Sequence, residues 1–182
     1  MENVLVIIDM QPQFASARDQ HTVANCQRLI RSFKQAHKRI IAVELESYGD
    51  THEEINALLT GYTNFQRLMK GWDDGSAELL QLLKSPCYHL TICGVNLAAC
   101  VAKTVKGLLE LGFAKIDVVS DACNDTCWGN PGGEAGKLWS WGHFWEIITD
   151  FRADIPDPDF CPRNLDVFDT NALTAQLVLD FH

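Results

Sequence analysis

Residues 4–9 read Val-Leu-Val-Ile-Ile-Asp, and this segment is the strongest indication of the fold class in the sequence. Its first five side chains are all apolar, with no polar residue alternating between them. Such an unbroken run is typical of a strand buried on both faces, as in a parallel sheet covered by helices. The run then meets the carboxylate of Asp9. The sequence therefore predicts a central parallel strand with an acidic side chain at its carboxyl end.

Downstream of this strand, strand-like and helix-like apolar patterns alternate. Short apolar runs predict further strands over 39–43, 90–93, 116–119 and 165–168. Helical spacing of apolar residues predicts helices over about 21–37, 53–59, 76–83, 98–112, 134–148 and 172–179. Two prolines predict extended or looped chain over 155–159, because proline disfavours helix at and before its own position. This alternation indicates an α/β fold with right-handed crossovers on a mostly parallel sheet of five or six strands.

Length and composition restrict the classes of protein to consider. The 182 residues, 47% hydrophobic, are the amount of chain expected for a single domain spanning 1–182. We expect no membrane partner, because no apolar run approaches the roughly 20 residues that cross a bilayer. A net charge of −9 disfavours nucleic acid as a partner. The scattered, odd set of seven cysteines and a start without a basic signal segment favour reduced thiols and a cytoplasmic location.

A carboxylate and a thiol are expected on the same rim of the predicted sheet. Asp9 follows the first strand and Cys100 follows the third, and ligands of open parallel sheets bind at the carboxyl ends of the strands. Cys100 also falls in the first turn of its predicted helix, where the helix dipole favours thiolate. We therefore expect Cys100 to have a lowered pKa and to react with iodoacetamide near pH 7 ahead of the other six cysteines.

Four segments, in the same order and spacing, resemble the isochorismatase-like cysteine hydrolases. The opening Val6–Phe14 contains Asp-x-Gln-x-x-Phe after a buried strand, and Lys70–Ala77 places a Ser-Ala pair shortly after a lysine. Cys93–Val101 resembles a Gly-Val-x-x-x-x-Cys-Val segment, and Val118–Ala122 carries the Asp-Ala that comes after it. The resemblance covers about residues 3–123.

This resemblance implies a three-layer α/β/α sandwich with a Rossmann-like sheet and an Asp9–Lys70–Cys100 triad. Asp9 would act as general base and then acid, Lys70 would hold the charged forms, and Cys100 would form a thioester. The backbone N–H groups of Asn96 and Cys100 would form an oxyanion hole, after a cis peptide bond between Val95 and Asn96. No cofactor is implied. Relatives commonly form dimers or tetramers, so a homo-oligomer is expected.

The sequence departs from the metal-binding members of this family. Nicotinamidases in the group carry Asp-x-His near the second strand, where this chain has Glu44–Tyr48 and a single nearby histidine, His52. A zinc site needs three or four ligands, so no metal is expected. Gln11, Phe14, Tyr48 and Trp72 are further candidates for contact with substrate.

These features favour a hydrolase that cleaves a C–N bond of a small amide, carbamoyl or ureido compound through a thioester. One alternative is a catalytically silent member of the family that serves as a binding or scaffolding protein. Another is a redox-sensing thiol protein, favoured by the number of cysteines. The residues that choose the substrate are not identified by the sequence, and neither is the role of the tryptophan-rich segment 128–145.

Overall fold

The computed structural model describes residues 1–126, 129–150 and 164–179. In this part of the chain six parallel strands form one sheet: β1 (Asn3–Ile8), β2 (Arg39–Leu45), β3 (Phe65–Lys70), β4 (His89–Val95), β5 (Lys115–Asn124) and β6 (Leu165–Phe168). The predicted α/β fold with a parallel sheet is confirmed. The looped stretch predicted over 155–159 lies outside the described residues.

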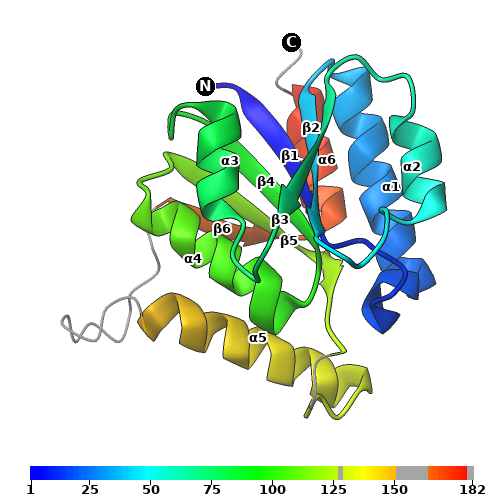
Figure 1. Cartoon of the computed structure of the whole chain (residues 1–182), viewed down its shortest axis with the longest axis vertical. Coiled ribbons are helices and arrows are strands. Elements are labelled where there is room, and N and C mark those ends of the chain that lie inside the picture. Colours follow the sequence, from blue (N-terminus) through cyan, green and yellow to red (C-terminus); the bar gives the residue numbers. More distant parts are fainter. Residues whose placement is uncertain (127–128, 151–163, 180–182) are drawn as a thin grey trace.

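Helices cover both faces of the sheet (Figure 1). One face packs against α1 (Gln20–Gln35), α2 (Glu53–Leu59) and α6 (Thr170–Leu179), and the other against α3 (Ser76–Leu83), α4 (Ala102–Glu110) and α5 (Gly133–Asp150). A 3₁₀ helix, Ala15–Arg18, precedes α1, and a π-helical turn, Leu97–Val101, precedes α4. None of the helices described is both long enough and apolar enough to cross a membrane.

Strand β1 is the centre of both hydrophobic layers. Val4, Val6 and Ile8 belong to the core beneath α3, α4 and α5, whereas Leu5 and Ile7 belong to the core beneath α1, α2 and α6. All six residues of the strand are buried. Because successive side chains of a strand point to opposite faces, only a continuous apolar run satisfies both layers.

The sequence pattern did not predict strand β3. This strand lies at the edge of the sheet, hydrogen-bonded to β2. Gln66, Arg67 and Met69 are exposed, and only Lys70, the last residue, is buried. An edge strand with so little burial has neither an apolar run nor a regular alternation of apolar and polar residues. Its sequence therefore does not predict a strand.

The strand order is β3-β2-β1-β4-β5-β6. Chain order therefore runs outward from β1 through β2 to β3, and then reverses to the other side of β1 with β4. In open parallel sheets, ligands bind at the carboxyl ends of the strands where the order reverses. The topology thus points to the ends of β1 and β4 as the place for a site.

Gly94 allows these two strands to lie close together there. It pairs with Ile8 and has a φ of +135°, a backbone conformation that residues other than glycine rarely adopt. A Cβ atom at Gly94 would lie 2.0 Å from the carbonyl oxygen of Ile8. Only glycine therefore permits this approach immediately before the turn that carries Cys100.

Candidate active site

Asp9, Lys70 and Cys100 meet at the carboxyl ends of the central strands. Asp9 follows β1, Cys100 lies in the π-helical turn after β4, and Lys70 ends β3 and reaches across the end of β2. The Lys70 Nζ atom lies 3.0 Å from Asp9 Oδ2, and both side chains are fully buried. The Asp9 carboxylate and the Cys100 thiol are close enough to influence each other's pKa. Residues far apart in the sequence are thus in one cluster.

The loop after β3 holds the Lys70 ammonium in place. Lys70 Nζ donates hydrogen bonds to the carbonyl oxygens of Trp72, at 3.0 Å, and Asp73, at 3.1 Å. A buried ammonium needs such acceptors as well as a counter-charge, because its loss of hydration is costly. The loop and the carboxylate of Asp9 together supply them.

Asp9 is arranged to take up a proton. Burial raises the pKa of its carboxyl group, against the opposing influence of the Lys70 charge and the Cys100 thiol. Neither carboxylate oxygen has a well-aligned hydrogen-bond donor among the described residues, since the ammonium is near Oδ2 but off the favoured direction. Its φ of 52° is uncommon for a residue other than glycine. A buried, under-satisfied carboxylate in a strained conformation is typical of a functional group.

Cys100 is a buried thiol, and the lowered pKa predicted from the sequence is wrong. Its side chain is 3% exposed. Burial, and next the negative charge of Asp9, raise the pKa of the Cys100 thiol to about 12, although Lys70 acts in the other direction. The helix dipole and a nearby cation, the two influences expected from the sequence, both favour the thiolate. Desolvation and the adjacent carboxylate outweigh both of them.

Asn96 turns the chain from β4 into the π-helical turn. It adopts a left-handed conformation, with φ 61° and ψ 54°, and its carbonyl accepts hydrogen bonds from the N–H groups of Ala99 and Val101. Its side-chain Nδ2 lies 3.8 Å from the sulfur of Cys100. The predicted cis peptide bond between Val95 and Asn96 is wrong, because the described residues contain no cis peptide bond. Here the left-handed residue redirects the chain instead. The oxyanion hole stays a prediction.

Sequence reasoning missed a second carboxylate beside the thiol. Asp73 Oδ1 lies 3.8 Å from Cys100 Sγ, and Asp73 Oδ2 lies 2.7 Å from Lys103 Nζ. The hydrogen bond from Lys103 is the main reason that the pKa of Asp73 lies below its ordinary value. The only signal available in the sequence was an acidic residue three positions after Lys70.

Gln11 is a structural residue at the rim. Its side chain is fully buried, and its Nε2 donates to the carbonyl oxygens of Leu45, at 2.9 Å, and Gly49, at 2.6 Å. Its Oε1 accepts from the N–H of Leu45 at 2.8 Å. Gln11 therefore joins the ends of β1 and β2, and its contact with substrate stays a prediction.

The aromatic candidates lie in loops at the same end of the sheet. The rings of Phe14 and Tyr48 stack, with centroids 4.6 Å apart and planes 9° apart. Tyr48 is 38% exposed and Trp72 is 83% exposed. Contact of these side chains with substrate stays a prediction, and Trp72 is exposed enough to serve an interface between subunits as well.

A buried carboxylate near the end of β2 accepts hydrogen bonds from neighbouring residues. Glu44 is buried, and its Oε1 accepts from the N–H and hydroxyl groups of Thr51 and from Arg67. His52 begins α2, where its Nδ1 accepts from the N–H of Glu54. The described residues contain no group of three or more His, Cys, Asp or Glu side chains that could hold a metal ion.

Two further thiols form a buried pair away from the cluster of Asp9, Lys70 and Cys100. Cys26 Sγ in α1 lies 3.8 Å from Cys93 Sγ in β4, and both residues are fully buried. A hydrogen bond with Cys26, followed by burial, raises the pKa of Cys93 well above its ordinary value. Buried thiols of this kind are chemically inert. Their packing role is sufficient to explain them.

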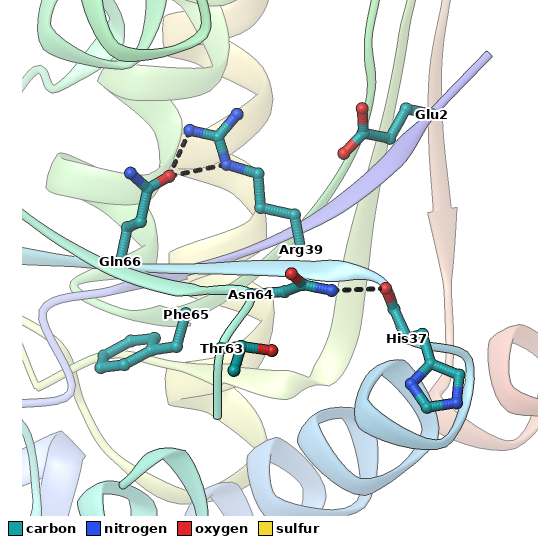
Figure 2. Close-up of a pocket in the computed structure, with 7 residues that line it drawn as sticks. All are labelled: Glu2, His37, Arg39, Thr63, Asn64, Phe65 and Gln66. Atoms are coloured by element: carbon teal, nitrogen blue, oxygen red, sulfur yellow. Dashed lines mark hydrogen bonds between the residues drawn. The ribbon is translucent and has the colours of Figure 1, made fainter. Parts of the chain in front are cut away.

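A polar hollow lies at the opposite rim of the sheet (Figure 2). It has a volume of about 440 Å³ and is lined by residues at and before the starts of β1, β2 and β3: Glu2, His37, Arg39, Thr63, Asn64, Phe65 and Gln66. Arg39 donates to the side chain of Gln66, and Asn64 donates to the carbonyl of His37. The amino ends of the strands face this hollow, so it is separate from the triad.

The fold and the cluster at the switch point define an α/β protein with a thiol, a carboxylate and an ammonium at the carboxyl ends of its strands. Residues 3–127 match the model of the Isochorismatase domain family. This match spans more than half of the chain, so the protein belongs to the isochorismatase family. The predicted family is confirmed, and membership supports a hydrolase.

Solved structures of low sequence identity share this fold. The MAR1 ribonuclease of Caenorhabditis elegans is 17% identical, with 97% of this chain and 81% of that chain covered and a TM-score of 0.72. The YcaC gene product of Escherichia coli, described as an octameric hydrolase of unknown specificity, is 15% identical over 99% and 81%, with a TM-score of 0.70. N-carbamoylsarcosine amidase of Thermoplasma acidophilum is 15% identical over 94% and 98%, with a TM-score of 0.63. No curated protein matches the chain.

Proposed function

We propose that this protein is a cysteine hydrolase that cleaves a C–N bond of a small amide, carbamoyl or ureido compound through a thioester on Cys100. The observation that carries the proposal is the buried Lys70–Asp9 pair, 3.0 Å apart, with the Cys100 thiol against the carboxylate. A buried pair of this kind costs desolvation and is poor evidence of a purely stabilising role. The family supports hydrolysis, and the N-carbamoylsarcosine amidase neighbour has the same fold.

The arrangement supports a proton cycle in which Asp9 is both base and acid. Asp9 takes the proton of the Cys100 thiol as the sulfur attacks the carbonyl carbon, so the thiol need not ionise beforehand. The tetrahedral oxyanion would accept hydrogen bonds from the N–H groups of Asn96 and Cys100. Collapse breaks the C–N bond, and the amine leaves with the proton from Asp9. Asp9 then takes a proton from water, whose oxygen attacks the thioester. Collapse breaks the C–S bond and releases the acid, and Asp9 returns its proton to the sulfur, which restores the thiol and the carboxylate.

Lys70 contributes by stabilising the negative charge of Asp9. Burial alone would hold the carboxyl group neutral, and a neutral carboxyl group cannot accept the thiol proton. The ammonium lies close enough to oppose that effect, while its two carbonyl partners keep it from moving toward the sulfur. Asp9→Asn is expected to lower kcat by about 10²–10⁴, the usual contribution of a positioned general base.

The test combines a substrate panel with detection of the acyl-enzyme. Amides, N-carbamoyl compounds and ureido compounds are incubated with the protein, quenched in acid and examined by peptide mass spectrometry. We expect an acyl group on the peptide that contains Cys100. Cys100→Ser should lose hydrolysis, whereas Cys87→Ser, at an exposed thiol, should retain it. Hydrolysis that survives in Cys100→Ser would contradict the mechanism.

One observation favours the alternative of a catalytically silent binding or scaffolding protein. Cys100 is only 3% exposed and its pKa is raised, which are also the properties of a packed structural thiol. The same panel separates the two functions. Compounds that raise the melting temperature without being hydrolysed would support the binding protein, and turnover of any compound would exclude it.

We further propose a cytoplasmic homo-oligomer, a dimer or tetramer, that takes small molecules rather than nucleic acid. Exposed apolar side chains at the end of edge strand β3, Met69 at 50% and Trp72 at 83%, support a contact between subunits. The net charge of −9 disfavours a polyanion. Light scattering of the purified protein and of Trp72→Ala tests the assembly, and a monomeric wild type at micromolar concentration would contradict it.

A further inference from the structure

The half-exposed carboxylate of Asp73 stands between the candidate nucleophile and solvent. Its Oδ1 lies 3.8 Å from Cys100 Sγ, while its side chain is 47% exposed. Asp9, the other carboxylate beside the sulfur, is fully buried. The two carboxylates therefore differ in exposure: Asp73 is open to solvent, whereas Asp9 can be reached only by a compound already bound against Cys100.

Lys103 fixes which oxygen of Asp73 is available. Its Nζ lies 2.7 Å from Oδ2, on the side away from the sulfur. The hydrogen bond and charge of Lys103 also hold the pKa of Asp73 below its ordinary value, so the carboxylate is charged at neutral pH. Oδ1 is left facing Cys100 as an anionic acceptor.

We propose that Asp73 is a specificity-determining residue that selects acyl compounds with an N–H donor or a positive charge next to the reacting carbonyl, and disfavours compounds with a carboxylate there. This inference rests on the proposed function. A carbonyl carbon in position for attack lies about 3–3.5 Å from the sulfur. Its neighbouring groups must then pass within a few ångströms of Oδ1. An ammonium, amidinium or –NH₂ group gains a charge-assisted hydrogen bond there, whereas a carboxylate meets a like charge.

The charge next to Cys100 is measured with two reagents that form a mixed disulfide with a thiol and carry end groups of opposite charge. These are (2-aminoethyl) methanethiosulfonate, a cation, and (2-sulfonatoethyl) methanethiosulfonate, an anion. Peptide mass spectrometry gives the rate at Cys100 with each reagent. The exposed Cys87 in the same sample corrects for the net negative charge of the protein.

Asp73→Asn removes the charge and keeps the shape of the side chain. We expect the corrected cation-to-anion rate ratio at Cys100 to fall by about tenfold, the size of one charge interaction in a half-exposed site. Asp74→Asn is the matched control, since it removes one charge from the same loop. The Asp74 carboxylate accepts from the N–H of Ser76, a role that asparagine also fills. This variant should change the ratio by less than about twofold.

A substrate pair provides the second measurement: β-alaninamide, a cationic amide, and succinamate, its anionic counterpart. The wild type should have the higher kcat/KM for the cation, and Asp73→Asn should narrow the difference. An unchanged labelling ratio in Asp73→Asn overturns the inference even if amides are hydrolysed. A Cys100 that reacts with neither reagent overturns it as well, because charged groups then do not reach Asp73. A shifted labelling ratio without hydrolysis of any amide supports the inference about charge and refutes the proposed function.

Discussion

Replacing Lys70 by methionine removes one partner of the buried ion pair and keeps an unbranched side chain of similar length. The Asp9 carboxylate then loses the ammonium 3.0 Å from its Oδ2, while both of its oxygens lack well-aligned donors among the described residues. Removal of one member of a buried pair costs about 3–5 kcal/mol, because the remaining charge is not compensated. Both side chains are fully buried. We therefore expect Lys70→Met to lower the free energy of unfolding by about 3–5 kcal/mol at neutral pH.

The loss of free energy of unfolding in Lys70→Met should be smaller at acidic pH than at alkaline pH. Burial already raises the folded-state pKa of Asp9 above its ordinary value of 3.8, and Lys70 opposes that rise. Without Lys70 the folded-state pKa rises further. A carboxyl group with a raised folded-state pKa gives its full stabilisation below its unfolded pKa and loses it as the pH rises through the folded value. Lys70→Met should therefore be less destabilising at about pH 5 than at about pH 8.

Urea unfolding followed by tryptophan fluorescence measures these free energies. Lys84→Met, at an exposed lysine, is the matched control and should leave the unfolding midpoint unchanged. Addition of Asp9→Asn to Lys70→Met should recover about 1–3 kcal/mol, because the uncompensated charge is gone. A Lys70→Met variant within about 0.5 kcal/mol of the wild type, the usual range for surface substitutions, would refute the buried pair. A loss of free energy of unfolding that is the same at about pH 5 and at about pH 8 would also refute it.

Three further results are expected. Iodoacetamide near neutral pH should alkylate the exposed Cys87 ahead of Cys100, because the pKa of the Cys100 thiol is raised to about 12. Peptide mapping should show that the alkylation rate of Cys100 is still rising at about pH 10. A rate that reaches a plateau near neutral pH would contradict this. Gly94→Ala should yield little folded protein by circular dichroism, because the added Cβ would lie 2.0 Å from the backbone of Ile8. If the variant instead melts like the wild type, β1 and β4 can move apart to accommodate the Cβ. Gln11→Ala should lower the free energy of unfolding by about 1–3 kcal/mol in urea, because partly buried backbone groups of Leu45 and Gly49 lose their partner. An unchanged midpoint would show that water replaces the side chain.

Much of the fold could be predicted because burial repeats locally along the chain. The unbroken apolar run of β1 and the helical spacing in α1 and α4 each report which faces are covered. Strand β3 could not be found in this way, since only its last residue is buried. The single predicted helix from near 98 is instead a π-helical turn followed by α4, a difference that depends on hydrogen-bond partners rather than on apolar spacing.

The sequence alone is enough to place Asp9 and Cys100 on one rim of the sheet, because each follows a buried parallel strand. The chemical properties of those two groups depend on the tertiary structure. Lys70 reaches Asp9 from an edge strand that has no sequence signal, and Asp73 reaches the sulfur from the loop beyond it. The raised pKa of Cys100 results from desolvation by several separate segments together with a neighbouring charge. Periodicity records which side of an element is covered, whereas a pKa depends on every group that packing brings within a few ångströms.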